Sequence, residues 1–145
     1  MTPDALFQIT NPLALLGWMA LALSPLAPRA ALAVAGVAIP LLLSVAYAGL
    51  VLAFWSGAPG GFGTLADVQL LFTDPNIALA GWVHYLAFDL FVGAWATRTA
   101  RDEGIPHLFL LPCLVLTFLF GPAGFLAFTA LRFTHARLPK AHPKG

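Results

Sequence analysis

The sequence places two ionisable side chains, His84 and Asp89, inside a long apolar segment. An acidic side chain at the centre of a membrane-spanning helix costs roughly 2.5–3.5 kcal/mol on insertion scales, so intramembrane acids mark candidate functional sites. Successive helical residues are rotated by ~100°, which places His84 and Asp89 about 140° apart around the helix axis. Each side chain is therefore expected to meet its partner on a neighbouring helix.

Tyr85 lies one helical turn before Asp89 and shares a face with Trp82, so its hydroxyl can reach the carboxylate. We interpret Asp89, His84 and Tyr85 as a candidate catalytic group that transfers protons in apolar surroundings. The alternative is a structural carboxyl that ties helices together. The candidates for binding a substrate are Trp82, Tyr47, His107 and Thr117.

The sequence gives no reason to expect a bound metal ion or another cofactor. His84, Asp89, His107 and Cys113 carry donor atoms, but none follows another at a spacing typical of a zinc site. Cys113 is also the only cysteine, so the chain forms no internal disulfide.

The composition indicates an integral membrane protein. The chain has 145 residues, of which 60% are hydrophobic and 9% are charged, whereas soluble domains carry about 25% charged residues. Its mean hydropathy is +0.88. The net charge of +1 does not indicate a nucleic-acid partner.

Four apolar segments, at about 5–23, 30–55, 75–97 and 107–133, are separated by Pro- or Gly-rich breaks. A bilayer core of about 30 Å needs about 20 helical residues, and all four segments are near or above that length. Residues 1–145 are therefore expected to form one all-α transmembrane domain, an integral membrane four-helix bundle.

A shorter apolar segment lies between the second and third predicted spans. Thr64 and Asp67 have the spacing of a helix-capping pair. Leu65, Val68 and Leu71 then share one helical face. We expect a short helix lying in the membrane interface, and an irregular loop is the alternative.

The fourth segment is expected to bend. Pro122 has no amide to bond the Phe118 carbonyl, which predicts a kink and a free acceptor. Thr117, Gly121 and Gly124 share one face with Cys113, and small residues of this kind allow helices to approach closely. We expect this face to pack beside the Asp89 face of the third segment.

On this topology, the basic residues are divided almost equally between the two sides of the membrane. Four spans put both termini on one side of the membrane. Basic residues mark the cytoplasmic side. The terminal side carries Arg132, Arg137, Lys140 and Lys144, and the other side carries Arg29, Arg98 and Arg101. Four against three favours cytoplasmic termini by a narrow margin.

Several sequence runs together resemble one known family. They are Trp82-Val83-His84-Tyr85-Leu86-Ala87-Phe88-Asp89-Leu90-Phe91-Val92-Gly93, Gly104-Ile105-Pro106-His107, Pro112-Cys113 and Phe120-Gly121-Pro122-Ala123-Gly124. They resemble the abscisic-acid-deficient-four family. Its plant members are plastid membrane proteins needed to make neoxanthin from violaxanthin, and its bacterial members are mostly uncharacterised.

The resemblance implies an isomerisation of an epoxide end group to an allene with a hydroxyl, which needs an acid and a base but no redox cofactor. A carotenoid or isoprenoid would reach such a site from the membrane lipid. The alternative function is a non-catalytic pigment- or lipid-binding protein, or an accessory factor to another membrane enzyme. A homo-oligomer is left open. Richness in Ala, Leu, Pro and Gly favours a bacterial inner-membrane protein.

Overall fold

The computed structural model describes residues 2–137, and these residues form helices and connecting turns without a β-strand. The all-α prediction is confirmed. The α-helices are α1 (Pro3–Ala22), α2 (Pro28–Ala33), α3 (Ile39–Phe54), α4 (Leu65–Leu71), α5 (Pro75–Asp102) and α6 (His107–Ala136). A π-helical turn, η1 (Val34–Ala38), joins α2 to α3, and a 3-10 turn, η2 (Trp55–Gly57), follows α3.

The wide turn η1 keeps α2 and α3 in one continuous helical segment, Pro28–Gly57. A proline inside a helix removes one amide and crowds the preceding turn. The π-helical turn directly before Ile39 and Pro40 accommodates that defect, and the Ile39 amide bonds back to Val34. With α1, α5 and α6, this segment makes four helices that have the length and apolar composition of a membrane span, before the bend in α6 is taken into account.

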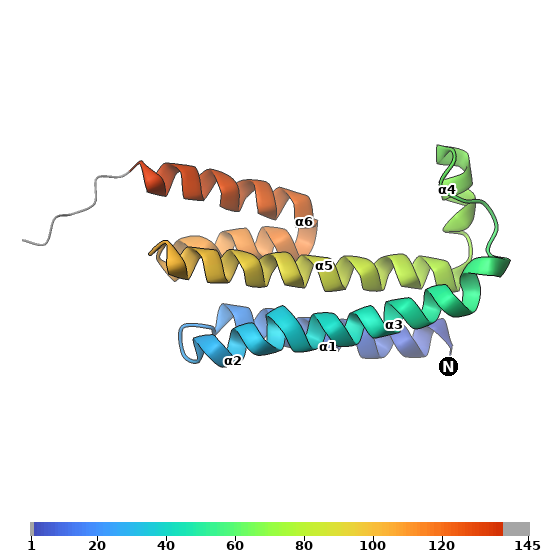
Figure 1. Ribbon diagram of the computed structural model, residues 1–145, viewed down its shortest axis with the longest axis horizontal. Coiled ribbons are helices and arrows are strands. Elements are labelled where there is room, and N and C mark those ends of the chain that lie inside the picture. The colour runs from blue at the N-terminus through green and yellow to red at the C-terminus, as the bar shows by residue number, and fades with distance from the viewer. Residues whose placement is uncertain (1, 138–145) are drawn as a thin grey trace, which may run out of the picture.

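Helix α5 is the centre of the bundle. It packs against α1, α3 and α6, and it carries more buried residues than any other helix among the described residues. Figure 1 shows α1, the α2–α3 segment and α5 lying side by side along the long axis of the molecule. Because α5 has a helix on several sides, its polar residues meet different neighbours on different faces.

The short segment after η2 is helical, as predicted. Thr64 caps α4, because its hydroxyl oxygen accepts a hydrogen bond of 3.1 Å from the Asp67 amide. The Thr64 hydroxyl in turn donates to the Asp67 carboxylate. Figure 1 shows α4 upright at the end of the bundle where α3 ends and α5 begins, on the side of α5 away from α1 and α3. Its location in a membrane interface stays a prediction.

The bend predicted in α6 is confirmed, and it is a reversal of direction. Phe120 has non-helical backbone angles, φ −145° and ψ 51°. Beyond it the chain returns along α5 (Figure 1), where Trp95 packs against Phe125 and Phe128 at ring-centroid distances of 5.5 and 5.4 Å. Each arm of this hairpin is shorter than the roughly 20 residues that cross a bilayer.

A pair of charged side chains ties the returning arm to the turn between α5 and α6. The Arg132 guanidinium donates to both carboxylate oxygens of Glu103 and lies 5.8 Å from the Trp95 ring centroid. The hydrogen bonds from Arg132 hold the pKa of the Glu103 carboxyl below its usual range. The end of α6 therefore lies at the same end of the bundle as its beginning.

The reversal corrects the expected topology. The sequence predicted that both ends of the chain lie on one side, but the structure places the start of α1 and the end of α6 at opposite ends of the bundle (Figure 1). All arginines of the described residues then gather at one end, at the start of α2 or the ends of α5 and α6: Arg29, Arg98, Arg101, Arg132 and Arg137. The basic residues of the described part of the chain therefore lie at one end of the bundle, and Lys140 and Lys144 of the earlier comparison lie outside the described residues.

The hairpin can be tested by thiol crosslinking in a Cys113→Ala background. A Glu103→Cys and Arg132→Cys pair should be joined by a short bifunctional thiol reagent, because the native side chains are in contact. A Gly61→Cys and Arg132→Cys pair is the control, because a straight α6 would carry Arg132 to the end of the bundle where the loop between α3 and α4 lies, whereas the hairpin keeps it beside Glu103. Efficient crosslinking of the control pair but not of the first pair would contradict the reversal.

The arginine distribution predicts that the end formed by α2, the end of α5 and the end of α6 faces the cytoplasm. In intact cells, a membrane-impermeant thiol reagent should label Gly61→Cys and leave Ala136→Cys unlabelled until the membrane is opened. Both variants carry Cys113→Ala. Labelling of Ala136→Cys from outside would show the inverse orientation.

Candidate functional site

The Asp89 carboxylate lies directly against the bend of α6. A Cβ atom at Gly121 would overlap this carboxylate, so the close approach of the two helices depends on glycine at position 121. The Asp89 Oδ2 atom is buried and accepts no hydrogen bond within the described part of the chain. Burying a carboxylate oxygen without a hydrogen-bond donor costs free energy, so an aspartate is not the residue that packing alone would favour at this contact.

Tyr85 contacts the α6 bend from the same face of α5 as Asp89. Its hydroxyl donates a hydrogen bond of 3.2 Å to the Phe118 carbonyl, the acceptor that Pro122 was predicted to leave free. The structure therefore confirms that the bend lies beside the Asp89 face of α5. It also gives Tyr85 a partner on another helix that sequence reasoning had not identified.

Thr117 lies between the two arms of the α6 hairpin. Its hydroxyl donates to the Cys113 carbonyl at 2.7 Å, and its backbone leaves room for nothing larger than glycine at position 124. Cys113, Thr117, Gly121 and Gly124 are all buried, as expected of a small-residue packing face. Thr117 itself is 1% exposed, which makes it a packing residue in this structure.

His84 lies on a different face of α5 from Asp89. Its ring stacks on Phe88 at a centroid distance of 4.6 Å and lies 5.4 Å from the ring of Tyr47 on α3. His84 and Tyr47 line one hollow of about 300 Å³. The structure thus joins His84 with Tyr47, a predicted binding residue, and does not bring the two central ionisable groups together.

Two separate hollows lie in line between α3 and α5, since their lining residues follow one another along both helices, and together they are called the groove. At the α4 end its walls include Trp55, Phe62 and Phe72. A second hollow of about 300 Å³ follows in the other direction. Its walls are Gly36, Val37, Pro40, Leu41, Ser44, Ala87, Phe88 and Phe91. The groove is therefore apolar along most of its length, with the phenol and imidazole between its two hollows.

The other two predicted binding residues lie elsewhere. The Trp82 indole donates to the Asn11 side-chain oxygen at 2.7 Å, and its ring stacks on Tyr85 at 5.4 Å. His107 begins α6 at the arginine-rich end, where its Nε2 atom lies 2.9 Å from the Ala22 carbonyl oxygen. Contacts between helices, such as that of Asn11 with Trp82, leave no signal in residue spacing.

Within residues 2–137, no group of three or more His, Cys, Asp or Glu side chains lies close enough to hold a metal ion. The polar features divide instead into the contact at the α6 bend, the α3–α5 groove and the cavity around His107. Among them, the groove is where two neighbouring side chains that can transfer protons, Tyr47 and His84, lie beside apolar space.

These features define an all-helical membrane protein with an apolar groove and a buried carboxylate at a helix reversal. The chain belongs to the ABA DEFICIENT 4-like family, whose model matches residues 5–128. That match includes the groove, the Asp89 contact and most of the α6 hairpin. No curated protein and no solved structure matches the chain.

The close contact of Asp89 with Gly121 predicts that substitutions at the two positions affect the thermal stability in a coupled way. Gly121→Ala should lower the thermal stability in detergent, at a cost of about 1–3 kcal/mol typical of overpacking. Combining it with Asp89→Ala should restore part of the loss, because the overlapping carboxylate is removed. Gly49→Ala is the control, since nothing lies within 4 Å of its Cβ position. Purely additive effects of the two substitutions would argue against the contact.

Proposed function

We propose that the protein is a membrane-embedded isomerase of a carotenoid or related isoprenoid, which it holds in the groove between α3 and α5. The observation that carries the proposal is the pairing of Tyr47 and His84 between two apolar hollows. Most ligand sites are apolar with a few convergent polar groups, and this groove has that composition.

The groove fits a long, narrow molecule better than a compact one. The helical stretch from Gly36 to Trp55 is roughly 28 Å long at 1.5 Å per residue, and its groove-lining residues contribute to both hollows. Exposed apolar residues border it, such as Leu41 and Phe91. A polyene could therefore enter sideways from the lipid and lie along α3.

The reaction implied by the family resemblance needs two protonic groups and no oxidant. The epoxide C–O bond breaks as the oxygen takes a proton, and a carbon of the polyene loses one to form the allene. We assign the Tyr47 hydroxyl to the oxygen and the neutral His84 imidazole to the carbon. Proton return from His84 to Tyr47, whose rings lie 5.4 Å apart, would restore both groups.

Asp89 and Tyr85 remain a second candidate catalytic pair. The observation in favour is the buried Asp89 Oδ2 atom, which has no hydrogen-bond donor among the described residues. They lie at the α6 bend, on another face of α5 from His84. In the proposed isomerase they hold the bend, and only a substrate reaching the α5–α6 side would touch them.

In this proposal the isomerase functions in a bacterial inner membrane, and α4 lies in the membrane interface. Leu71 and Phe72 at the end of α4 line the groove hollow that holds His84. The short helix would therefore cover the groove at the non-cytoplasmic surface. Its exposed apolar residues, including Leu65 and Leu70, suit contact with lipid headgroups and acyl chains.

The proposal is tested by expressing variants in a carotenoid-producing strain and analysing pigments by mass spectrometry. His84→Gln and Tyr47→Phe should abolish the isomerised product, because each removes a proton-transferring group with little change of shape. Leu52→Ala is the control, since Leu52 on α3 is 85% exposed and borders neither hollow. All three proteins should insert and remain folded.

Three outcomes separate the alternatives. Product formation by both His84→Gln and Tyr47→Phe overturns the assignment of the groove. Loss of product in folded Asp89→Asn, with His84→Gln active, moves the active site to the α6 bend. Pigment that copurifies unchanged with the wild-type protein identifies a binding protein without catalysis.

A further inference from the structure

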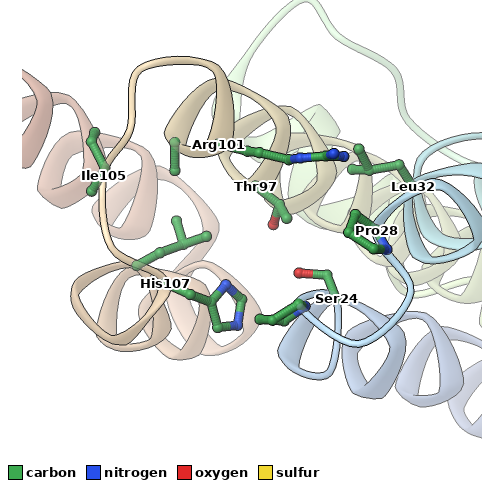
Figure 2. A pocket seen from close by; sticks show the side chains of 10 residues that line it. Ser24, Pro28, Leu32, Thr97, Arg101, Ile105 and His107 are labelled. Atoms are coloured by element: carbon green, nitrogen blue, oxygen red, sulfur yellow. The ribbon is translucent and has the colours of Figure 1, made fainter.

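We propose that the cavity at the arginine-rich end binds a phosphate group, supplied by an anionic lipid headgroup or by free phosphate. The cavity has a volume of about 270 Å³ and lies where α1 ends, α2 begins and α5 passes into α6. Figure 2 shows Ser24, Thr97, Arg101 and His107 around it. It lies apart from the α3–α5 groove and does not depend on the proposed isomerase activity.

Ser24 supplies a buried donor. Its side chain is 4% exposed, its hydroxyl points into the cavity in Figure 2, and it makes no side-chain hydrogen bond within residues 2–137. The hydroxyl oxygen opens onto the cavity space, so a ligand oxygen placed there can accept its hydrogen bond.

Arg101 adds charged donors to the cavity, and His107 forms part of its wall. Arg101 extends over the cavity from the end of α5 (Figure 2) and forms no ion pair among the described residues. The His107 Nε2–H donates to the Ala22 carbonyl at 2.9 Å, so Nδ1 of the neutral ring is an acceptor and His107 adds no donor to the cavity. Thr97 donates to the Gly93 carbonyl at 2.8 Å and contributes only an acceptor.

The chemistry of these donors selects an anion with several oxygens. A guanidinium binds phosphate through parallel hydrogen bonds, and basic pockets between helices on the cytoplasmic side suit lipid headgroups. The Arg101 guanidinium on α5 and the Ser24 hydroxyl in the turn between α1 and α2 donate from different elements, which suits an anion such as phosphate that presents oxygens in several directions. Glu103, the neighbouring acid, is already engaged by Arg132.

The remaining walls explain why a lipid can supply the phosphate. Pro25, Pro28, Leu32, Ile105 and Leu110 make most of the cavity lining apolar. Such walls can hold the glycerol and first methylene groups next to a headgroup. The site lies at the end of the helices, at the depth where headgroups occur.

The test compares lipid retention by the full-length protein in native mass spectrometry. Phosphatidylglycerol should remain bound to the wild-type protein in preference to phosphatidylcholine. Arg101→Gln and Ser24→Ala should lower that retention, by about tenfold for Arg101→Gln, since charge-assisted hydrogen bonds are the stronger ones. Arg98→Gln is the control, because Arg98 lies on the same helix end but does not line the cavity.

Added inorganic phosphate identifies the source of the group. Displacement of phosphatidylglycerol by millimolar phosphate, lost in Arg101→Gln, shows a site that takes the free anion. Retention unaffected by phosphate but lowered by Arg101→Gln and Ser24→Ala shows a lipid site. Equal effects of Arg101→Gln and Arg98→Gln, or equal retention of the two lipids by the wild-type protein, overturn the proposal.

Discussion

A carbonyl oxygen inside a bilayer needs a donor from the protein, because no water is present there to provide one. Pro122 deprives the Phe118 carbonyl of its helical donor, and the Tyr85 hydroxyl on α5 replaces it. This hydrogen bond lies at the reversal of α6, next to the contact of Asp89 with Gly121. The position of the whole returning arm depends on that point of attachment.

The hydrogen bond between Tyr85 and Phe118 also assigns different neighbours to different faces of α5. One face holds the α6 bend through Tyr85 and Asp89, and another lines the groove through His84 and Phe88. Packing at the α6 bend and the proposed ligand binding in the groove therefore use different residues of one helix. The WVHYLAFDLFVG run combines both sets of residues because each face receives every third or fourth position.

Much of the fold could be predicted from local sequence. The apolar lengths predicted the long helices, Thr64 and Asp67 predicted the cap of α4, and Pro122 predicted the bend. The direction after the bend could not be predicted, because it depends on contacts of Arg132 and Phe128 with residues about thirty positions earlier. Since apolarity alone defines a candidate span, a hairpin and a crossing helix give the same signal.

The candidate site could also be predicted only in part from the sequence. Helical geometry predicted that His84 and Asp89 point in different directions, and the structure agrees. It could not predict which helix each would meet, so the pairing of His84 with Tyr47 and of Tyr85 with Phe118 required the tertiary structure. Ser24 and Arg101 were missed because a buried hydroxyl and an interfacial arginine are common residues whose convergence depends on four helix ends.

The α6 hairpin has a consequence for how the protein is made. A fourth crossing helix would require the insertion machinery to move Arg132 and Arg137 through the hydrocarbon layer, against both desolvation and the membrane potential. In the observed fold these arginines remain on the side where α6 begins. With the arginine-rich end in the cytoplasm, as predicted above, the last helix would enter the bilayer as a loop from the ribosome side, after the other helices have provided the Tyr85 and Asp89 surface that receives it.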